Sequence, residues 1–210
     1  MIHLVDNVTS TNIWLNHFNK DYFDSVLSLK QSRGYGRVGR VWESDIGGLY
    51  YSLVLPYRNI MSIVIGVSVA DILFNNKVNV KLKWPNDILV NGKKLGGIIC
   101  QSQDGKTIVG LGINIDNKPM LATAISLSDL GCNMDKLYFI DELTKKIKIS
   151  MDYSDIDIIN KFLHYDCLIG KEVSWQEGNG RVETISVDGS LVVRDKDNQS
   201  ISLTDEVHLE

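Results

Sequence analysis

The sequence predicts an α+β fold, in which helices pack against a mixed or antiparallel sheet, followed by a small C-terminal β-barrel. Three observations lead to this expectation. Strand-like and helix-like stretches follow one another over residues 1–165, an Asn-Gly dipeptide marks a hairpin among them, and short strands fill residues 166–210. The 210 residues are 44% hydrophobic, enough for one substantial core and a small second domain.

The first third of the sequence predicts a capped helix, several strands and one long loop. Thr9 or Ser10 can cap a helix in which Ile13, Trp14 and Phe18 share one apolar face. The next strand is followed by 18 residues, 31–48, that hold five glycines and are too many for an ordinary connection. We expect strands at 1–5, 25–30, 49–55 and 78–84 and a helix at 59–74.

The second half of the sequence begins with a hairpin and ends with a series of short strands. Strands at 87–90 and 94–101 flank Asn91-Gly92, the dipeptide that most readily forms a type I′ turn. We expect a further strand at 107–115 and helices at 135–150 and 156–163. After a boundary near Asp166, the strands KEVSW, RVETISV, SLVVR and ISLTDEVHL alternate with the turns EGNG, VDGS and DKDNQ.

The long loop, QSRGYGRVGRVW, is a candidate anion site. Glycines allow successive backbone N–H groups to converge, and the arginines Arg33, Arg37 and Arg40 add charge-assisted donors, so that phosphate is a natural guest. The spacing matches neither the Walker lysine motif nor a dinucleotide fingerprint. A mobile surface loop with solvated arginines is the alternative interpretation.

Three further motifs carry polar side chains beside glycines. KLKWPNDILVNGKKLGGIICQ places Lys83 and Asn86 before the hairpin turn and Lys94 after it, next to glycines on which a ligand could lie. Asp87 can equally be structural, and Lys94 an ordinary strand lysine. VGLGIN offers Asn114 or merely close packing, and Ser10-Thr11-Asn12 is either a small ligand site or only a helix cap.

In order, spacing and identity, these motifs resemble the biotin protein ligase family: STN, then GYGRVGRVW, then KWPNDILVNGKKLGGI, then VGLGINI. The resemblance covers about residues 1–170. It implies the family's class II synthetase-like catalytic fold over 1–165 and an SH3-like barrel over 166–210. It also implies ATP-dependent formation of biotinyl-5′-AMP, with Mg²⁺, and transfer of biotin to a lysine of a biotin carboxyl carrier domain.

The resemblance also implies roles for individual residues. The catalytic residues would be Lys94 and Arg37, which would both reach the carboxylate of biotin. The remaining biotin contacts would come from Ser10, Thr11, Gln31, Gly34, Gly97 and Gly112. The ATP side would comprise Arg37, Arg40, Trp42, Asn86, Lys94 and Asn114. No residue is assigned to the metal.

One position departs from the family pattern. Many members carry Arg-Gly-Arg where this sequence has Tyr35-Gly36-Arg37, so a phenol replaces one guanidinium. Because a phenol supplies no positive charge, we expect the adenylate to be held less tightly than in a relative with arginine at this position.

Composition narrows the setting and the partners. The net charge of −4 disfavours DNA as a partner, and the biotin motif starts at Ser10, too early for a preceding DNA-binding domain. Cys100, Cys132 and Cys167 fit no disulfide framework, and no signal or membrane-spanning segment is expected, so the predicted setting is the cytoplasm. A homodimer is left open. A lipoate or octanoate ligase and a non-catalytic biotin sensor are the alternative functions.

Overall fold

The computed structural model describes residues 1–17 and 21–209. A seven-stranded mixed sheet forms its centre, in the order β1-β2-β3-β7-β6-β5-β4. The strands are β1 (Ile2–Val8), β2 (Ser25–Gln31), β3 (Leu49–Pro56), β4 (Val80–Lys83), β5 (Asp87–Val90), β6 (Lys93–Gln103) and β7 (Lys106–Ile113). Only β1 and β2 are paired in parallel among these strands. The predicted mixed sheet packed with helices is therefore confirmed.

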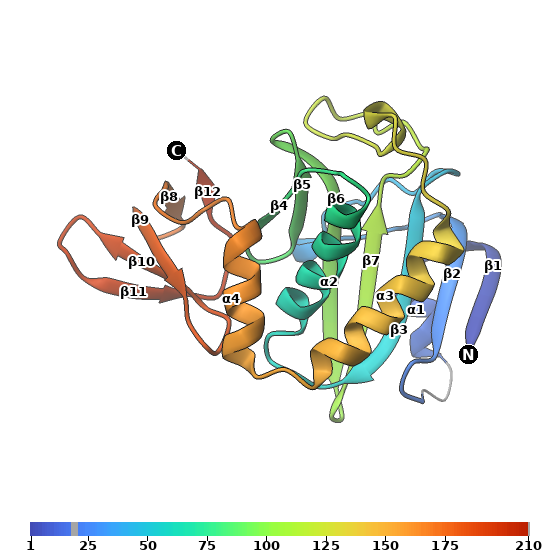
Figure 1. The fold of residues 1–210 in the computed structure, drawn as a ribbon, viewed down its shortest axis with the longest axis horizontal. Coiled ribbons are helices and arrows are strands. Elements are labelled where there is room, and N and C mark those ends of the chain that lie inside the picture. Colours follow the sequence, from blue (N-terminus) through green and yellow to red (C-terminus); the bar gives the residue numbers. More distant parts are fainter. Residues whose placement is uncertain (18–20, 210) are drawn as a thin grey trace.

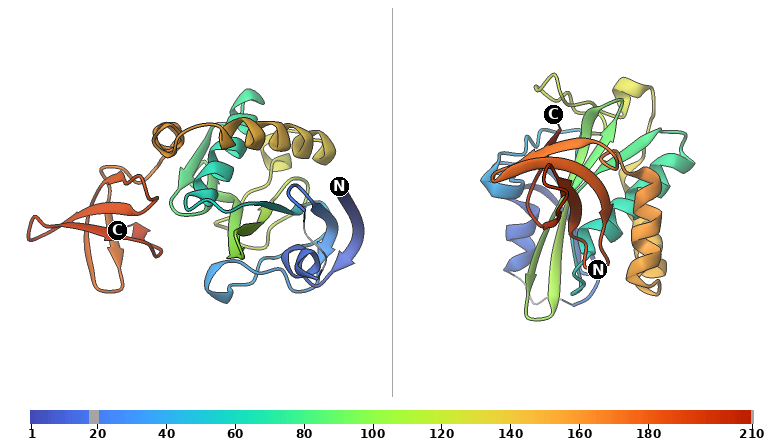
Figure 2. Two further views of the ribbon diagram at one scale, coloured as in Figure 1. Left: turned by 90° about the horizontal axis from the view of Figure 1, so that it is seen from below. Right: turned by 90° about the vertical axis from the view of Figure 1, so that its left-hand side faces the viewer.

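Helices cover the two faces of this sheet unequally. Three long helices, α2 (Met61–Asn75), α3 (Lys136–Met151) and α4 (Asp155–Tyr165), lie on one face, and the short α1 (Thr11–Asn16) lies on the other (Figures 1 and 2). The larger core cluster joins α2 and α3 to alternate strand residues such as Leu53 and Val109. On the α1 face, only Leu15, Val26, Val54 and Ile108 form a buried apolar cluster. The α1 face is thus the one with room for polar groups.

The first helix differs from its prediction. Leu15 is its buried apolar anchor at 1% exposure, whereas Ile13 is 39% exposed, so the predicted apolar face is wrong at this position. Phe18 lies outside the described residues. Ser10 stands at the N-cap, but its side chain makes no capping hydrogen bond.

The hairpins follow the chemistry of their turns. Asn91 and Gly92 have φ values of 51° and 73°, as a type I′ turn requires, and they join β5 to β6 as predicted. Asp104 and Gly105 repeat this geometry between β6 and β7, with φ values of 51° and 73°. The two turns lie at opposite ends of β6, and the β5–β6 hairpin carries the Lys94 and Asn86 of the site described below.

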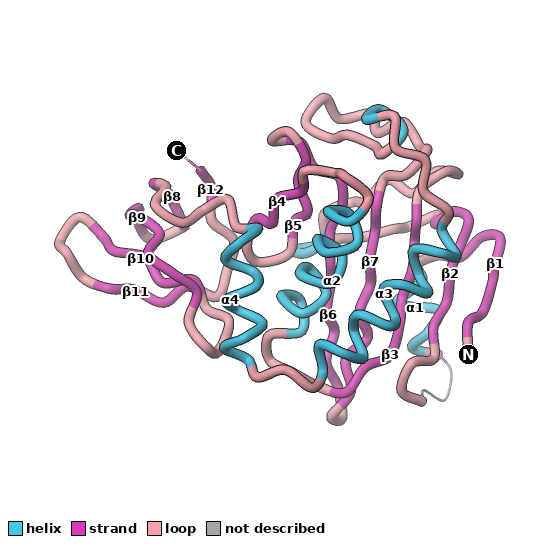
Figure 3. The backbone as a smooth tube through the Cα atoms, viewed as in Figure 1, coloured by secondary structure: helices cyan, strands magenta, loops and turns pink. Residues whose placement is uncertain are grey.

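A second, five-stranded antiparallel sheet follows α4, in the order β11-β10-β9-β8-β12 (Figure 3). Its strands are β8 (Glu172–Trp175), β9 (Gly178–Ile185), β10 (Leu191–Asp195), β11 (Ser200–Leu203) and β12 (His208–Leu209). This sheet agrees with the expected small β domain, while its SH3-like closure and the division at Asp166 stay predictions. The predicted turn EGNG is wrong, because Gly178, Asn179 and Gly180 belong to β9.

The second sheet is fixed against the first unit by its β9–β10 turn. Trp84 Nε1 donates to the Gly189 carbonyl at 2.9 Å, and Asn59 Nδ2 donates to the Asp188 carbonyl at 2.9 Å. Gly189 also packs against Ile60 of the α2 entry. These contacts set the position from which the second sheet reaches the loop at 31–48.

Among the described helices, none is long and apolar enough to cross a membrane.

Candidate active site

The floor of the candidate site lies on the α1 face of β3, β7 and β6, around glycines of β7 and β6. Gly112 of β7 lies between Tyr50 of β3 and Gly97 of β6, and Gly110 lies between Ser52 and Ile99 two residues further along. Because strand residues two apart share a face, the glycines at 110 and 112 open the same surface. A Cβ at Gly110 would collide with the Asn12 side chain and one at Gly112 with the Trp42 indole, so both glycines serve close packing of side chains on this face.

One wall of the site is a hydrogen-bond network around α1. Gln31 Oε1 accepts from the Thr11 backbone N–H at 2.8 Å and from Thr11 Oγ1 at 3.1 Å, while Gln31 Nε2 donates to Ser44 Oγ at 2.8 Å. Ser52 Oγ lies 2.7 Å from Thr11 Oγ1 and 2.6 Å from Asn12 Oδ1. Thr11 belongs to the STN motif, and Gln31 is the first residue of the long loop. Hydrogen bonds thus hold these two motifs together.

The loop at 31–48 is a small hairpin rather than an open connection. The Trp42 N–H donates to the Gly34 carbonyl at 2.9 Å, and the Gly36 N–H donates to the Arg40 carbonyl at 2.7 Å. Its tip, a 3₁₀ turn at Arg37–Gly39, has Val38 at φ 54° and Gly39 at φ 70°. This tight tip places Arg37 and Arg40 on the same side of the glycine patch.

Trp42 and Lys94 stand together over the floor. A Cβ added at Gly112 would lie 2.6 Å from Trp42 Cε2 and Nε1, so the indole rests directly on that glycine. Lys94 Nζ lies 5.6 Å from the Trp42 ring centroid and 2.7 Å from Asp87 Oδ1. The lysine is therefore charge-paired across the β5–β6 hairpin and faces the aromatic ring.

These groups enclose a cavity of about 260 Å³. Ten of the twelve predicted site residues line it: Ser10, Thr11, Gln31, Arg37, Arg40, Trp42, Asn86, Lys94, Gly97 and Gly112. A second cavity of about 300 Å³ includes Asn114 in its lining. Both cavities are lined by Val41, Trp42, Lys94 and Leu121, so Trp42 and Lys94 stand where the two adjoin.

Sequence and structure comparisons identify the family to which this fold belongs. The model of the biotin/lipoate A/B protein ligase family matches residues 4–117, more than half of the chain. The chain belongs to this family. A biotin–[acetyl-CoA-carboxylase] ligase of Paracoccus denitrificans is 27% identical over 80% of this chain and 83% of its own length. The biotin protein ligase of Aquifex aeolicus, solved with biotin and ATP, superimposes with a TM-score of 0.87, 26% identity and coverage of 100% and 98%.

Other relatives of this biotin/lipoate ligase family are much longer than the matched region. The chloroplastic biotin–protein ligase 1 of Arabidopsis thaliana is 37% identical over 41% of this chain, but the match spans only 28% of that relative. The similarity to it extends over 103 aligned residues.

Two of the residues that were predicted to form the site, Gly34 and Asn114, do not line the first cavity. Gly34 sits behind the wall, where a Cβ would lie 2.5 Å from the Trp42 carbonyl oxygen and 2.9 Å from Gln31 Nε2. Asn114 is 5% exposed, and its amide donates to the Ile125 carbonyl at 3.2 Å and accepts from Asn117 Nδ2 at 2.9 Å. Gly34 therefore allows close packing within the loop at 31–48, and Asn114 holds the chain near Asn117 and Ile125. The contacts of both residues with a ligand stay predictions.

Asn86 and Arg37 differ in how far the protein itself satisfies them. Asn86 lines the cavity while its Nδ2 donates to the Ile98 carbonyl at 3.1 Å. Arg37 Nε is buried and has no hydrogen-bond partner among the described residues, and neither does the indole N–H of Trp42. Buried donors of this kind are costly unless a ligand or water pairs with them. Arg37 and Trp42 are hence the lining residues most clearly prepared for a guest.

Sequence reasoning did not assign several polar residues that contribute to the site. Asn12 fills the space over Gly110 and donates to Gln101 Oε1 at 3.0 Å, and the Tyr35 hydroxyl donates to the same oxygen at 2.9 Å. Glu206, from the second sheet, also lines the cavity. Asn12 belongs to the STN motif and was within reach of motif reasoning, whereas Gln101 and Glu206 contact residues 66 and 166 positions away in sequence.

Proposed function

We propose that this chain is a biotin protein ligase, which activates biotin with ATP and transfers it to one lysine of a biotin carboxyl carrier domain. The observation that carries the proposal is that Arg37 and Lys94 line one cavity, together with the glycines of β6 and β7 and the Thr11–Gln31 network. The Aquifex aeolicus relative, which binds biotin and ATP, covers the whole chain at a TM-score of 0.87 and so supports it.

The first step joins two negatively charged groups. A biotin carboxylate oxygen attacks the α-phosphorus of ATP, the bond to the bridging oxygen breaks, and pyrophosphate leaves with its electron pair. Two like charges 4 Å apart repel by about 4 kcal/mol at an effective dielectric of 20. Such a barrier term corresponds to roughly a thousandfold in rate. We assign Lys94 and Arg37 to offset this repulsion by holding fixed positive charge at the reacting groups.

The two adjoining cavities suggest how the substrates are placed. We propose that biotin lies in the 260 Å³ cavity, against Thr11, Gln31 and the glycine floor, with adenosine toward the 300 Å³ cavity that Asn114 lines. Trp42 and Lys94, which border both, would then stand where carboxylate and α-phosphate meet. Lys94 would exchange its contact with Asp87 for the substrates or share it with them.

In the second step, a neutral lysine amine of the carrier domain attacks the biotinyl carbonyl carbon, an amide forms, and AMP leaves as the amine loses a proton. The four histidines, His3, His17, His164 and His208, do not line the cavity, so they are not proposed as bases. The protein contribution here is orientation of the mixed anhydride and exclusion of water from the carbonyl.

We propose Mg²⁺ as the companion of the ATP phosphates, because Mg²⁺ usually keeps several waters and binds through one or two carboxylates plus phosphate oxygens. The described cavity fits a metal carried by the nucleotide, since Glu206 is the one carboxylate in its lining and it contacts Arg40. The metal would neutralise phosphate charge.

We further propose a cytoplasmic setting, with the carrier domain and not DNA as the macromolecular partner.

The decisive experiment is biotin-dependent exchange of labelled pyrophosphate into ATP by the purified chain, followed by transfer of labelled biotin to candidate carrier domains. We expect exchange that requires biotin and is not supported by lipoate or octanoate. Exchange supported by lipoate instead of biotin would identify a lipoate ligase. Biotin binding by titration without any exchange would identify a non-catalytic sensor.

A further inference from the structure

Two acidic residues of the segment between β11 and β12, Asp205 and Glu206, contact the arginines of the loop at 31–48. Arg40 Nη2 donates to Glu206 Oε2 at 2.5 Å, and Arg40 Nη1 donates to Glu206 Oε1 at 3.4 Å. Arg37 Nη2 lies 3.7 Å from Asp205 Oδ1. The resemblance to the biotin protein ligase family places both arginines on the ATP side, so these carboxylates contact the groups that would bind nucleotide phosphate.

The segment that carries these acids lies between two paired strands, because Leu203 of β11 pairs with Leu191 and β12 begins at His208. The neighbouring Val207 is 2% exposed and belongs to the main core cluster. His208 and Leu209 pair with Ser174 and Val173 in the second sheet, which itself is fixed through Gly189 to Trp84. Glu206 is thus presented to Arg40 by a positioned backbone rather than by a free chain end.

The contact has the donor geometry that phosphate would use. Two N–H groups of a planar guanidinium meet the two oxygens of one carboxylate, and the same fork binds two oxygens of a phosphate. The Glu206 side chain is 21% exposed, whereas the Arg40 side chain is 61% exposed, so the arginine can be approached from solvent while still paired. Because an ion pair this exposed is weak, an incoming polyphosphate can replace it.

We propose that Glu206, assisted by Asp205, is an internal competitor for nucleotide phosphate: it occupies the loop arginines in the ligand-free protein and leaves them when polyphosphate binds. This inference rests on the proposed use of ATP. It makes the second sheet a regulator of nucleotide affinity, since the acid–arginine contact must break before Arg40 can engage phosphate. The opposite role, in which Glu206 orients Arg40 for phosphate, predicts a weaker rather than a tighter complex when the acid is removed.

The test is isothermal titration of the full chain and its Glu206→Gln variant, each with Mg-ATP and separately with inorganic pyrophosphate. Glu206→Gln should bind both ligands about two- to fivefold more tightly, the range expected when one partly exposed ion pair no longer competes. Asp205→Asn should act in the same direction with a smaller effect, because its carboxylate is 98% exposed and 3.7 Å away.

Glu183→Gln is the matched control. It removes an equally charged acid from another arginine contact in the same sheet, that with Arg194, and should leave both affinities unchanged. Affinity gained equally by this control would show a general effect of net charge and overturn the proposal. Unchanged or weaker binding by Glu206→Gln would also overturn it.

Amide hydrogen exchange supplies a measurement that does not depend on catalysis. In ligand-free protein, Glu206→Gln should accelerate exchange in residues 36–42, and pyrophosphate should accelerate exchange in residues 204–206 of the unmodified chain. If the unmodified chain binds ATP and pyrophosphate but neither change occurs, the competitor role alone is wrong. If neither the chain nor the variant binds either ligand, the proposed ligase activity is wrong as well.

Discussion

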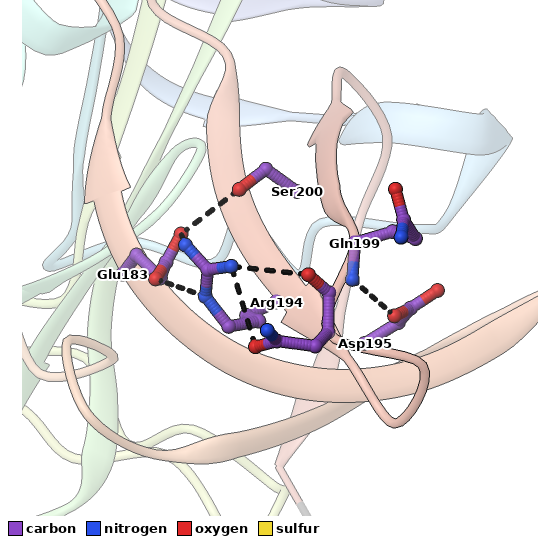
Figure 4. Close-up of polar contacts among 6 residues, drawn as sticks. Glu183, Arg194, Asp195, Gln199 and Ser200 are labelled. Atoms are coloured by element: carbon purple, nitrogen blue, oxygen red, sulfur yellow. Dashed lines mark hydrogen bonds and ion pairs between the residues drawn. The ribbon is translucent and has the colours of Figure 1, made fainter.

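Two arginine–carboxylate contacts in this molecule differ in how completely the protein satisfies the guanidinium. Arg194 of the second sheet donates through Nε and Nη2 to Glu183 at 2.6 and 3.2 Å, and through Nη1 to the Asn198 carbonyl at 3.1 Å (Figure 4). Ser200 Oγ adds a bond to the same carboxylate at 3.3 Å. By contrast, Arg37 leaves a buried Nε without a partner and meets Asp205 only at 3.7 Å.

This difference separates a group used for structure from groups kept for a ligand. Arg194 has partners on every side and cross-links β9, β10 and the following turn, which is a stabilising role. Unsatisfied donors at Arg37 and Trp42 carry a cost in the ligand-free state, and such a cost is typical of functional sites whose partner arrives with the substrate. Removing a structural arginine should therefore lower stability, whereas removing a ligand-binding cation should lower activity.

The largest expected effect comes from Lys94. Lys94→Gln should lower the rate of biotin-dependent pyrophosphate exchange by about 10²–10³-fold, the usual loss when one fixed electrostatic donor is removed from a reacting group. The free energy of unfolding should change by at most about 1 kcal/mol, since the contact with Asp87 is partly exposed. Steady-state exchange kinetics and urea denaturation measure the two quantities.

Arg194→Gln is the counterpart that can break the comparison. We expect normal exchange kinetics together with a small loss of thermal stability, because its contacts lie on the second sheet away from the cavity. A variant of Arg194 that slowed exchange as much as Lys94→Gln does would show that the distinction between structural and ligand-binding cations is wrong.

The next effect concerns how tightly the site is packed before any ligand binds. Gly112→Ala places a methyl group 2.6 Å from the Trp42 indole and should lower the free energy of unfolding by about 1–3 kcal/mol, the usual cost of overpacking. Gly97→Ala is the matched control in the neighbouring strand. Its Cβ would lie 3.5 Å from Lys94 Cε and 3.6 Å from Trp42, so stability should stay within about 0.5 kcal/mol.

Urea denaturation of both alanine variants without ligand checks this pair. Equal stability of the two would mean that Trp42 moves aside without cost and does not rest on Gly112. The comparison with the second sheet is then sharpened, because Gly180 there is equally confined, with a Cβ position 2.9 Å from the Arg194 carbonyl carbon. Tight packing against glycine would be common to both regions, and unsatisfied donors would remain the distinguishing property of the site.

A smaller effect tests the charge that the loop lacks. Tyr35→Arg should lengthen the half-life of enzyme-bound biotinyl-5′-AMP roughly tenfold, since a charge-assisted hydrogen bond contributes about 1.5 kcal/mol or more. The phenol now donates to Gln101 Oε1, so the change also removes a tether of the loop to β6. Tyr35→Phe removes that tether without adding charge and is the control. An intermediate that decays as fast or faster in Tyr35→Arg would refute the expectation.

Much of the fold could be predicted because its signals are local. Asn91-Gly92 needs only its own two φ values to turn the chain, and the structure has both positive. Asp104-Gly105 carries the same signal, but the prediction ended the strand at residue 101 and missed it. Gly178 and Gly180 were interpreted as turn residues, whereas Gly180 serves the close approach of β10 to β9.

The site was predictable only as far as motifs extend. Ten lining residues between Ser10 and Gly112 were found because each lies in a short pattern of glycines and polar groups. Glu206 and Gln101 act over 166 and 66 residues of sequence separation, so no local pattern indicates their contacts with Arg40 and Tyr35. Asn114 shows the opposite difficulty, because a motif position does not reveal that its amide is engaged by Ile125 and Asn117.

The smallest expected effect compares backbone strain in the two regions. The site loop has Val38 at φ 54°, while the turn between β10 and β11 has Asn198 at φ 62°. Left-handed conformations suit asparagine but are costly for a β-branched residue. Val38→Asn should therefore raise the free energy of unfolding by about 0.5–1 kcal/mol, and little packing is lost because Val38 is 84% exposed.

Asn198→Val is the reciprocal substitution and should destabilise the chain by more than Val38→Asn stabilises it. It introduces the same strain and also removes the Asn198 Oδ1 contact with Arg194 at 3.4 Å. Urea denaturation of both variants measures the pair. A neutral or destabilising Val38→Asn would show that the loop tip is not strained, and the excess energy of the site would then reside in its unpaired donors, Arg37 Nε and Trp42 Nε1, rather than in its backbone.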